Sequence, residues 1–433
     1  MKSFVITTLG CKVNRYESEA ISEGLLSQGW SPAEKGAKAD LCIINTCMVT
    51  GKAATQSRQA VRHSIRNHKE SIVIATGCHA QVAPEVFASI PDVHYVVGNS
   101  FKDRIPGLAE QKSRLEHTTI LVEDLSRFRI FQDLPVTRLV KRTRCFVKIQ
   151  DGCDAFCSYC IIPYARGRSR SLRPEIVIER INRLNAQGHS EAVLCGIHMG
   201  RYGQDLDPVI SLADLIGSIE ILTSIPRLRL SSIEPREISE ELIRYLAKSS
   251  QTCPHLHIPL QSGDDKILKA MKRPYNSRFF EELIDHIIQT IRHVAIGVDL
   301  LVGFPGETEK AFENTCRLIE KLAVAYLHVF PFSPQAGTPA AAMKNRVPPE
   351  IVKKRCQYLR KLGQIKRSKF NERFVGSIAE VLIEGKPDIS TGYLKGFTKN
   401  YIPVFVKGNK ELLNRIVEVK IDKIEKDRVF AKL

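Results

Sequence analysis

Residues 145–160 read CFVKIQDGCDAFCSYC, a short apolar run followed by three cysteines at the spacing C-x3-C-x2-C. The run CFVKIQ predicts a β-strand, so Cys153, Cys157 and Cys160 lie in the loop that leaves its carboxyl end. Three thiolates leave one position open on a tetrahedral zinc ion or on a four-iron cube, and no fourth Cys or His follows at ligand spacing. The pattern therefore favours an iron–sulfur cube with one iron free to bind a substrate over a structural zinc knuckle.

The region around this loop, residues 140–370, alternates apolar runs with amphipathic helical stretches. Six runs read as strands: CFVKIQ, EAVLCGIH, RLRLSSIE, HLHIPLQ, AIGVDLLVGF and YLHVFPFS. Six βα units predict a partial (β/α)6 barrel, in which chemistry gathers at the carboxyl ends of the strands. A doubly wound open sheet is the alternative, because strand counting does not separate the two.

The regions on either side differ from this one, and together the three predict an α/β protein of three domains. Residues 1–130 contain five aliphatic runs (SFVITTLG, DLCIINT, SIVIATG, VHYVVG and TTILVED) separated by helical stretches, which predicts a doubly wound parallel sheet covered on both faces. Residues 371–433 alternate apolar and polar positions with period two between short turns. That pattern predicts a small five-stranded antiparallel β-barrel of the OB kind.

The charge of the chain is strongly positive. The 433 residues include 64 Lys and Arg against 47 Asp and Glu, a formal net charge of +17. A basic soluble protein is the plain interpretation, and a polyanion partner such as nucleic acid is the sharper one. No run of about eighteen apolar residues predicts a membrane span. The start, MKSFVITTLGC, reads as a first strand and not as an export signal, so we expect a cytoplasmic protein whose twelve cysteines stay reduced.

A second set of three cysteines lies in the first region. Cys11, Cys47 and Cys78 each follow a predicted strand and are 36 and 31 residues apart, about one βα unit each. In a parallel sheet the three would meet at one carboxyl edge, where open α/β sheets bind ligands. They therefore suggest a second three-cysteine cluster. The remaining cysteines read as buried structural thiols: Cys42, Cys145, Cys195, Cys253, Cys316 and Cys356.

The segment CDAFCSYC resembles the radical S-adenosylmethionine (SAM) enzymes. The resemblance implies that Cys153, Cys157 and Cys160 hold a [4Fe–4S] cluster, that SAM chelates the open iron, and that Tyr159 packs against the adenine. Further SAM contacts are predicted at the ends of the barrel strands, where polar groups and glycine follow the apolar runs. They are Gly196, Ser232, Glu234, Gln261, Ser262 and Asp299.

The combination of motifs narrows the resemblance. TLGCKVNRYESEA, NTCMVTGKA, TGCHAQ and DGCDAFCSYCIIPYARGRSRS are similar to the radical SAM methylthiotransferases, and the last region is similar to their TRAM domain. The resemblance covers nearly the whole chain. It implies an enzyme that inserts sulfur at an unactivated carbon, methylates it, and consumes two molecules of SAM. Cys11, Cys47 and Cys78 would then hold a second [4Fe–4S] cluster that carries the sulfur.

Three branches of that family differ in substrate. Lys12-Val13-Asn14 and GIHMGRYGQDL resemble the branch that converts threonylcarbamoyl-adenosine at tRNA position 37 to its 2-methylthio form. The isopentenyl-adenosine branch is the nearest alternative, and the ribosomal-protein branch fits IIPYARG less well. A non-catalytic RNA-binding iron–sulfur protein is the alternative of another class. Gln335 departs from the basic residue that the family commonly has near that position. The sulfur and electron donors are not identified by any motif.

Basic and aromatic residues support RNA as the partner. Arg166, Arg168 and Arg170 follow the cysteine loop, and Lys395 and Phe397 lie in the last region. Phosphate neutralisation combined with base stacking is how single-stranded RNA is bound, and an anticodon loop offers unpaired bases. The long helix before the last region adds further cations: Lys353, Lys354, Arg355, Arg360, Lys361, Lys366, Arg367 and Lys369.

Overall fold

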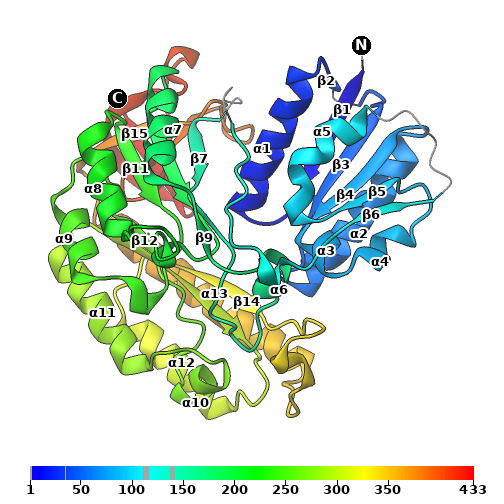
Figure 1. Cartoon of the computed structure of the whole chain (residues 1–433). Helices are drawn as coiled ribbons and strands as arrows, with labels where there is room; N and C mark the ends of the chain where they lie inside the picture. The colour runs from blue at the N-terminus through cyan, green and yellow to red at the C-terminus, as the bar shows by residue number, and fades with distance from the viewer. Residues whose placement is uncertain (1, 35, 111–116, 137–141) are drawn as a thin grey trace. The chain divides into compact units, whose positions relative to one another are not determined.

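The aliphatic runs at the start of the chain form a parallel sheet of six strands in the computed structural model, which describes residues 2–34, 36–110, 117–136 and 142–433 (Figure 1). The strand order is β2-β1-β3-β4-β5-β6. The sequence predicts every strand except β2, which has only two residues. The strands are β1 (Ser3–Thr8), β2 (Ser31–Pro32), β3 (Leu41–Thr46), β4 (Ile72–Gly77), β5 (Tyr95–Val97) and β6 (Thr119–Leu121).

Alternation along β3 shows why this sheet is covered on both sides. Leu41 and Ile43 belong to a core that includes residues of α1 (Lys12–Ser27) and α5 (Ile105–Ala109). Cys42 and Ile44 belong to the opposite core, with residues of α2 (Gly51–Asn67), α3 (Cys78–Val82) and α4 (Pro84–Ala88). Successive side chains of a strand point to opposite faces, so a wholly apolar strand requires both layers. The predicted doubly wound sheet is confirmed, and Cys42 is a core residue.

The central region has the six parallel strands that the sequence predicts. They form two three-stranded sheets, β11-β10-β7 and β12-β13-β14. Two bridging pairs, Leu228 with Thr252 and Ser232 with His257, connect β11 to the segment around β12, so the strands make a partial barrel. The strands are β7 (Arg144–Lys148), β10 (Glu191–Cys195), β11 (Arg227–Leu230), β12 (His255–His257), β13 (Ala295–Val302) and β14 (Tyr326–Pro331).

Amphipathic helices cover the barrel strands, and side-chain caps begin several of them. Ser211, Ser239 and Thr308 each accept a hydrogen bond from a backbone N–H in the first turn of the helix that follows. The helices are α7 (Pro174–Ala186), α8 (Leu212–Leu222), α9 (Glu240–Lys248), α10 (Asp265–Ala270), α11 (Ser277–Thr290), α12 (Glu309–Lys321) and α13 (Pro349–Glu372).

The last region is a closed barrel with the strand order β15-β16-β17-β19-β18. Its interior is apolar and includes Val381, Val404 and Val419. The predicted small five-stranded barrel is confirmed: four of its pairings are antiparallel, and the fifth, β17 with β19, is parallel and closes the barrel. The strands are β15 (Ile378–Ile383), β16 (Leu394–Thr398), β17 (Pro403–Val406), β18 (Ile416–Glu425) and β19 (Arg428–Lys432).

The chain divides into two compact units that do not coincide with the three predicted domains. The first unit comprises Met1–Arg138, Gln150–Leu172 and Ser333–Ala341, so the cysteine loop belongs with the N-terminal sheet. The second unit comprises Leu139–Ile149, Arg173–Phe332 and Ala342–Leu433. The boundaries 1–130, 140–370 and 371–433 stay a prediction.

Candidate functional site

The loop that carries Cys153, Cys157 and Cys160 is closed at its base by a short antiparallel pair, β8 (Gln150–Asp151) with β9 (Arg170–Ser171). The Cys153 N–H donates to the carbonyl of Gly167 at 3.0 Å. Gly152 has φ +75°, and a Cβ placed there would lie 1.8 Å from the carbonyl oxygen of Arg168. Only glycine allows the two ends of the loop to approach this closely.

The three loop cysteines differ in exposure. Cys157 is buried, whereas Cys153 and Cys160 are partly exposed. The Cys160 N–H donates to the Cys157 carbonyl at 3.0 Å, which turns the chain between these two thiols. Thiolates are the ligands that iron–sulfur clusters prefer, so the donor set fits such a group. Their role as ligands stays a prediction.

The second triad comes together at the carboxyl edge of the N-terminal sheet. Cys11 follows β1, Cys47 follows β3 and Cys78 begins α3 directly after β4, and these three strands are neighbours. Gly10 lies against Cys47, since a Cβ at Gly10 would be 2.7 Å from the Cys47 Sγ. Each thiol is close enough to the other two for their charges to interact. The convergence that the strand pattern predicts is therefore present in the structure.

The Cys47 thiol would have to lose its proton in order to bind a metal ion. Burial raises the pKa of the Cys47 thiol to about 12, and the neighbouring Cys78 thiol raises it in the same direction. Without a bound cation the thiol is therefore protonated at neutral pH, and metal binding would release its proton. Arg166 opposes the increase, because its positive charge favours the thiolate.

Three polar side chains of the second unit form a compact cluster of another kind. Among the residues that the structure describes, the ligand atoms of His257, Asp299 and His328 lie within 4.8 Å of one another.

Arg166 connects the end of the cysteine loop to the second triad. Its side chain is fully buried at the end of α6 (Ile162–Arg166). The guanidinium Nε donates to the Cys78 Sγ at 3.4 Å, and Nη1 donates to Glu17 Oε1 at 2.6 Å. Nη1 also lies 3.1 Å from Asp151 Oδ1, and Nη2 donates to Asn14 Oδ1 at 2.6 Å. The predicted RNA contact of Arg166 is therefore corrected, because a buried guanidinium with these partners does not meet a phosphate.

Further buried charges surround Arg166. Lys102, which is also fully buried, pairs with Glu17. Burial lowers the pKa of Lys102, and the Glu17 carboxylate opposes that change. For Arg166, burial lowers the pKa, but the charges of Cys78, Glu17 and Asp151 outweigh it and raise the pKa above its ordinary value. The buried Arg170 also lies 3.8 Å from Asp151, so three cations share the two carboxylates of Glu17 and Asp151. Each buried cation of this network therefore has a carboxylate partner, which offsets the cost of its burial.

Arg168 and Arg170 have different environments. Arg170 is buried, and its Nη2 donates to the Arg166 carbonyl at 2.8 Å. Its predicted RNA contact is corrected for the same reason as that of Arg166. Arg168 is exposed, pairs with Asp154 at 3.2 Å, and lies 5.7 Å from the centre of the Phe156 ring. RNA binding by Arg168 stays a prediction.

Arg355 and Gln335, which the sequence singles out, are both buried in the structure. Arg355 of α13 is buried and pairs with Glu307 at 3.0 Å and Glu309 at 2.7 Å, so it is removed from the predicted basic surface. Gln335, which departs from the family pattern, is buried in the first unit, and its carbonyl accepts a hydrogen bond from the Thr338 hydroxyl at 2.8 Å.

The predicted SAM contacts outside the cysteine loop all belong to the second unit. Gly196 directly follows β10, and Ser232 is an exposed residue just after β11. Glu234 forms an ion pair with the buried Arg273. Gln261 has φ +70°, and Ser262 is buried with its Oγ accepting from a backbone N–H at 3.2 Å. Tyr159 is partly exposed in the first unit. The SAM contacts stay predictions.

Asp299 differs from the prediction in its place on the strand. It lies in the middle of β13 and not at its end, and its carboxylate Oδ1 is 2.8 Å from His257 Nε2 and 3.2 Å from His328 Nδ1. Burial raises the pKa of Asp299, but the hydrogen bonds from the two imidazoles outweigh burial and hold the pKa below its ordinary value. His257 Nδ1 in turn lies 3.4 Å from the Tyr326 hydroxyl.

Three family models match successive parts of the chain. A family model described as Uncharacterized protein family UPF0004 matches residues 3–98, the Radical SAM superfamily matches residues 147–319, and the TRAM domain matches residues 372–433. Threonylcarbamoyladenosine tRNA methylthiotransferase MtaB of Bacillus subtilis is 36% identical over 424 residues, which cover 97% of this chain and 94% of that protein. The chain belongs to the radical SAM methylthiotransferase family. It is an enzyme, a transferase, and its family uses SAM and [4Fe–4S] clusters.

Other relatives of this methylthiotransferase carry a second name. A tRNA-2-methylthio-N(6)-dimethylallyladenosine synthase of Carboxydothermus hydrogenoformans is 35% identical over 426 residues, 97% of this chain and 96% of that protein. Among solved structures, the radical SAM methyltransferase TsrM from Kitasatospora setae matches with a TM-score of 0.57 and 16% identity, over 79% of this chain and 75% of that one. At that identity the likeness concerns the fold, and it confirms the radical SAM architecture. Among the described residues of the methylthiotransferase, no helix is long and apolar enough to cross a membrane.

Sequence reasoning did not identify the residues that surround Arg166 in this methylthiotransferase. Asn14 and Glu17 lie one turn apart on α1, directly after Cys11, and both are buried. Two polar residues three positions apart, directly after a candidate ligand, were the signal that the sequence contained. Lys102 had no such signal, because its partner Glu17 is 85 residues away.

Proposed function

We propose that this enzyme converts N6-threonylcarbamoyladenosine at position 37 of tRNA to 2-methylthio-N6-threonylcarbamoyladenosine. The observation that carries the proposal is the pair of three-cysteine sets in one compact unit, each without a fourth thiol. One set is typical of any radical SAM enzyme. The second set distinguishes enzymes that also insert sulfur, and the curated relatives named MtaB support the choice of substrate.

The two triads would hold two [4Fe–4S] clusters. Cys153, Cys157 and Cys160 would hold the cluster that binds SAM, and Cys11, Cys47 and Cys78 would hold the other. When bound, the clusters supply the electron that cleaves SAM and a site for the sulfur to be transferred. The open iron in each follows from the missing fourth thiol.

The protein's own residues supply position and charge. Arg166 would orient Cys78 and contribute a positive charge beside the thiols, while Glu17, Asp151 and Asn14 hold the guanidinium in place. Asn14 belongs to the Lys12-Val13-Asn14 triplet that resembles the threonylcarbamoyl branch. Its buried contact with Arg166 gives it a role in shaping the second triad, independent of the substrate.

RNA binding is proposed for the exposed cations and the small barrel. Arg168, Lys395 and Phe397 remain the candidate contacts, and the net charge of +17 favours a polyanionic substrate. Because tRNA is the substrate, we place the enzyme in the cytoplasm. It also requires a sulfur source and a one-electron donor, neither of which a motif identifies.

Nucleoside mass spectrometry tests the proposal. tRNA from cells that lack this protein should lose the 2-methylthio-threonylcarbamoyl nucleoside and accumulate its precursor. Complementation with the wild-type chain should restore it, and a chain carrying Cys157→Ala should not. Persistence of the nucleoside in the deletion strain would refute the substrate.

The second candidate substrate is isopentenyl-adenosine at the same position. The relatives named dimethylallyladenosine synthases are 32–35% identical to this chain, close to the 33–37% of the MtaB relatives. The same mass spectra separate the two, because loss of the methylthio-isopentenyl nucleoside alone would support this candidate. The alternative of a non-catalytic RNA-binding iron–sulfur protein is not favoured, because the chain belongs to a family of transferases.

A further inference from the structure

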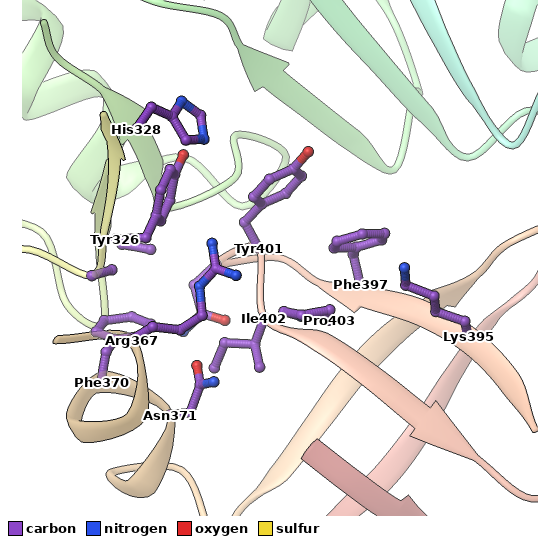
Figure 2. Close-up of a pocket in the computed structure, with 13 residues that line it drawn as sticks. Tyr326, His328, Arg367, Phe370, Asn371, Lys395, Phe397, Tyr401, Ile402 and Pro403 are labelled. Carbon is purple, nitrogen blue, oxygen red and sulfur yellow. The ribbon is translucent and has the colours of Figure 1, made fainter. Parts of the chain in front are cut away.

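The second unit contains a cavity of about 240 Å3 where the barrel meets the small β-barrel (Figure 2). The starts of β13 and β14, the helix α13, and the strands β16 and β17 contribute to its wall. We call it the seam pocket and define it by the side chains that project into or around it in Figure 2. They are Tyr326, Arg367, Asn371, Lys395, Phe397 and Tyr401.

Buried arginines of the barrel hold the two walls of the seam pocket together. Arg227 donates to the Phe397 carbonyl at 3.0 Å, and Arg229 donates to the Lys399 carbonyl at 2.9 Å. Arg229 is itself held by Glu191 at 2.7 Å. Both arginines are almost wholly buried, so the end of β16, which carries Phe397, and the turn with Tyr401 that follows it are anchored to the barrel. The pocket is therefore formed before any ligand arrives.

Aromatic rings and cations alternate around the pocket. The rings of Phe397 and Tyr401 stack with centroids 5.0 Å apart and planes 23° apart. Tyr401, which lines the cavity, has φ +68°, a left-handed conformation that costs a tyrosine energy. In Figure 2 the guanidinium of Arg367 points up between the rings of Tyr326 and Tyr401, and its Cζ lies 5.6 Å from the Tyr326 centroid. The Lys395 Nζ lies 5.7 Å from the Phe397 centroid.

This lining suits one class of ligand. No carboxylate lines the cavity among the described residues, whereas the lining includes the positively charged Arg367 and Lys395. Aromatic faces stack with any base, and a neighbouring cation binds the phosphate that follows it. The amide of Asn371 adds a group that can bond to a base edge. The volume is below the range of about 300–1,000 Å3 that drug-sized ligands occupy, which favours a single base.

We propose that the seam pocket binds one unpaired nucleotide of the RNA substrate, and that this nucleotide is not the one that is modified. Ala295 and Tyr326, at the amino ends of β13 and β14, line the pocket. Chemistry in such barrels gathers at the carboxyl ends, and an eight-residue strand such as β13 separates the two ends by about 25 Å. The choice of RNA as the ligand rests on the proposed function.

The test combines abasic RNA with a pocket variant. The probe is an anticodon stem-loop hairpin in which each loop nucleotide in turn is abasic, and its Kd for the full-length holoenzyme is measured by fluorescence anisotropy. One loop position other than 37 should weaken binding about 5- to 150-fold, since stacking contributes about 1–3 kcal/mol per base. In Phe397→Leu the intact hairpin should bind more weakly by a similar factor, and the abasic change should then have no further effect.

A matched control comes from the same small barrel. Phe430 is partly buried, packs against Tyr393 at 5.6 Å, and does not line the seam pocket. Phe430→Leu should keep the wild-type sensitivity to the abasic position, and thermal melting should show that both leucine variants are folded. The proposal would be overturned if the abasic change weakened binding equally in Phe397→Leu and Phe430→Leu. It would also be overturned if no abasic position of the loop weakened binding to the wild-type enzyme.

Two readouts separate this inference from the proposed function. The wild-type holoenzyme is assayed in parallel for its methylthio nucleoside product by mass spectrometry. Coupling between Phe397 and a loop base without the threonylcarbamoyl product supports the pocket and refutes the proposed substrate. Product formation without coupling refutes the pocket and leaves the proposed substrate in place.

Discussion

Cys153, Cys157 and Cys160 lie within one loop, whereas Cys11, Cys47 and Cys78 come from the ends of three strands that are 36 and 31 residues apart. The loop is closed by a two-residue strand pair and a glycine that no other residue can replace without a clash. The sheet-edge triad, Cys11, Cys47 and Cys78, instead depends on the register of β1, β3 and β4. It also depends on the buried Arg166, which comes from another part of the chain. One three-cysteine set is therefore held by local structure and the other by long-range contacts. Different substitutions should disrupt the two sets.

The largest effect is expected from the cysteines themselves. Anaerobic reconstitution of the wild-type chain should give about eight irons, and Cys157→Ala should reduce this to about four and abolish deoxyadenosine formation from SAM. Cys47→Ala should also bind about four irons but still cleave SAM, because the loop set is intact. Iron analysis and chromatography of deoxyadenosine check both.

Cys42→Ala is the matched control for Cys47→Ala, since Cys42 lies in β3, the strand that Cys47 follows, and its side chain belongs to the core. It should keep the full iron content. A wild-type protein that saturates near four irons would contradict the two-cluster arrangement, and deoxyadenosine formation by Cys157→Ala would remove the radical SAM role of the loop.

Removal of Arg166 should break the sheet-edge triad selectively. Arg166→Gln leaves Glu17 and Asp151 buried with less positive charge, and breaking a buried ionic network costs about 3–5 kcal/mol of stability. Urea unfolding measures the loss. The loop set should still support SAM cleavage in the protein that remains folded.

Arg168→Gln is the control, because Arg168 lies two residues away and is exposed. Its unfolding free energy should change by about 0.5 kcal/mol or less, as expected for a surface substitution. Equal stability of the two variants would show that the buried network does not support the N-terminal sheet.

Alanine substitutions at Gly152 and Gly10 should have smaller effects, each confined to one triad. Gly152→Ala places a Cβ against the Arg168 carbonyl and should disturb the loop, and Gly10→Ala places one against the Cys47 Sγ and should disturb the sheet edge. Each should reduce iron binding at its own triad only. Gly29→Ala has a similar positive φ but open space, so it should cost only about 1–2 kcal/mol of backbone strain and leave iron content unchanged.

The smallest effect concerns His257, Asp299 and His328, a third polar set assembled from neighbouring strands but without thiols. The pKa of Asp299 is lower in the folded protein than in the unfolded chain, so its carboxylate stabilises the fold above about pH 4, and this contribution is lost as the pH falls further. Asp299→Asn should be less stable than the wild type at pH 7, and the gap should narrow toward pH 3. A constant gap in urea unfolding across this range would contradict the pairing.

Local patterns were enough to predict most of the fold. Aliphatic runs separated by helical stretches specified the N-terminal sheet and the six barrel strands, because burial on both faces demands continuous apolar strands. The parallel pairing of β17 with β19 was missed, since period-two alternation defines which face is buried but not the direction of the partner strand. Asp299 was misplaced because the apolar run continues on both sides of it.

The sequence by itself determined the two cysteine triads, since strand ends and loop spacing are local features and the carboxyl ends of parallel strands meet at one edge. Only the tertiary structure decided which arginines are available to RNA. Arg166, Arg168 and Arg170 alternate in one short basic stretch, yet two are buried and one is exposed. A buried cation requires partners. Those of Arg166 include Asn14 and Glu17, which lie 152 and 149 residues away along the sequence. Such partners are brought together only by the packing of distant segments, which no local pattern records.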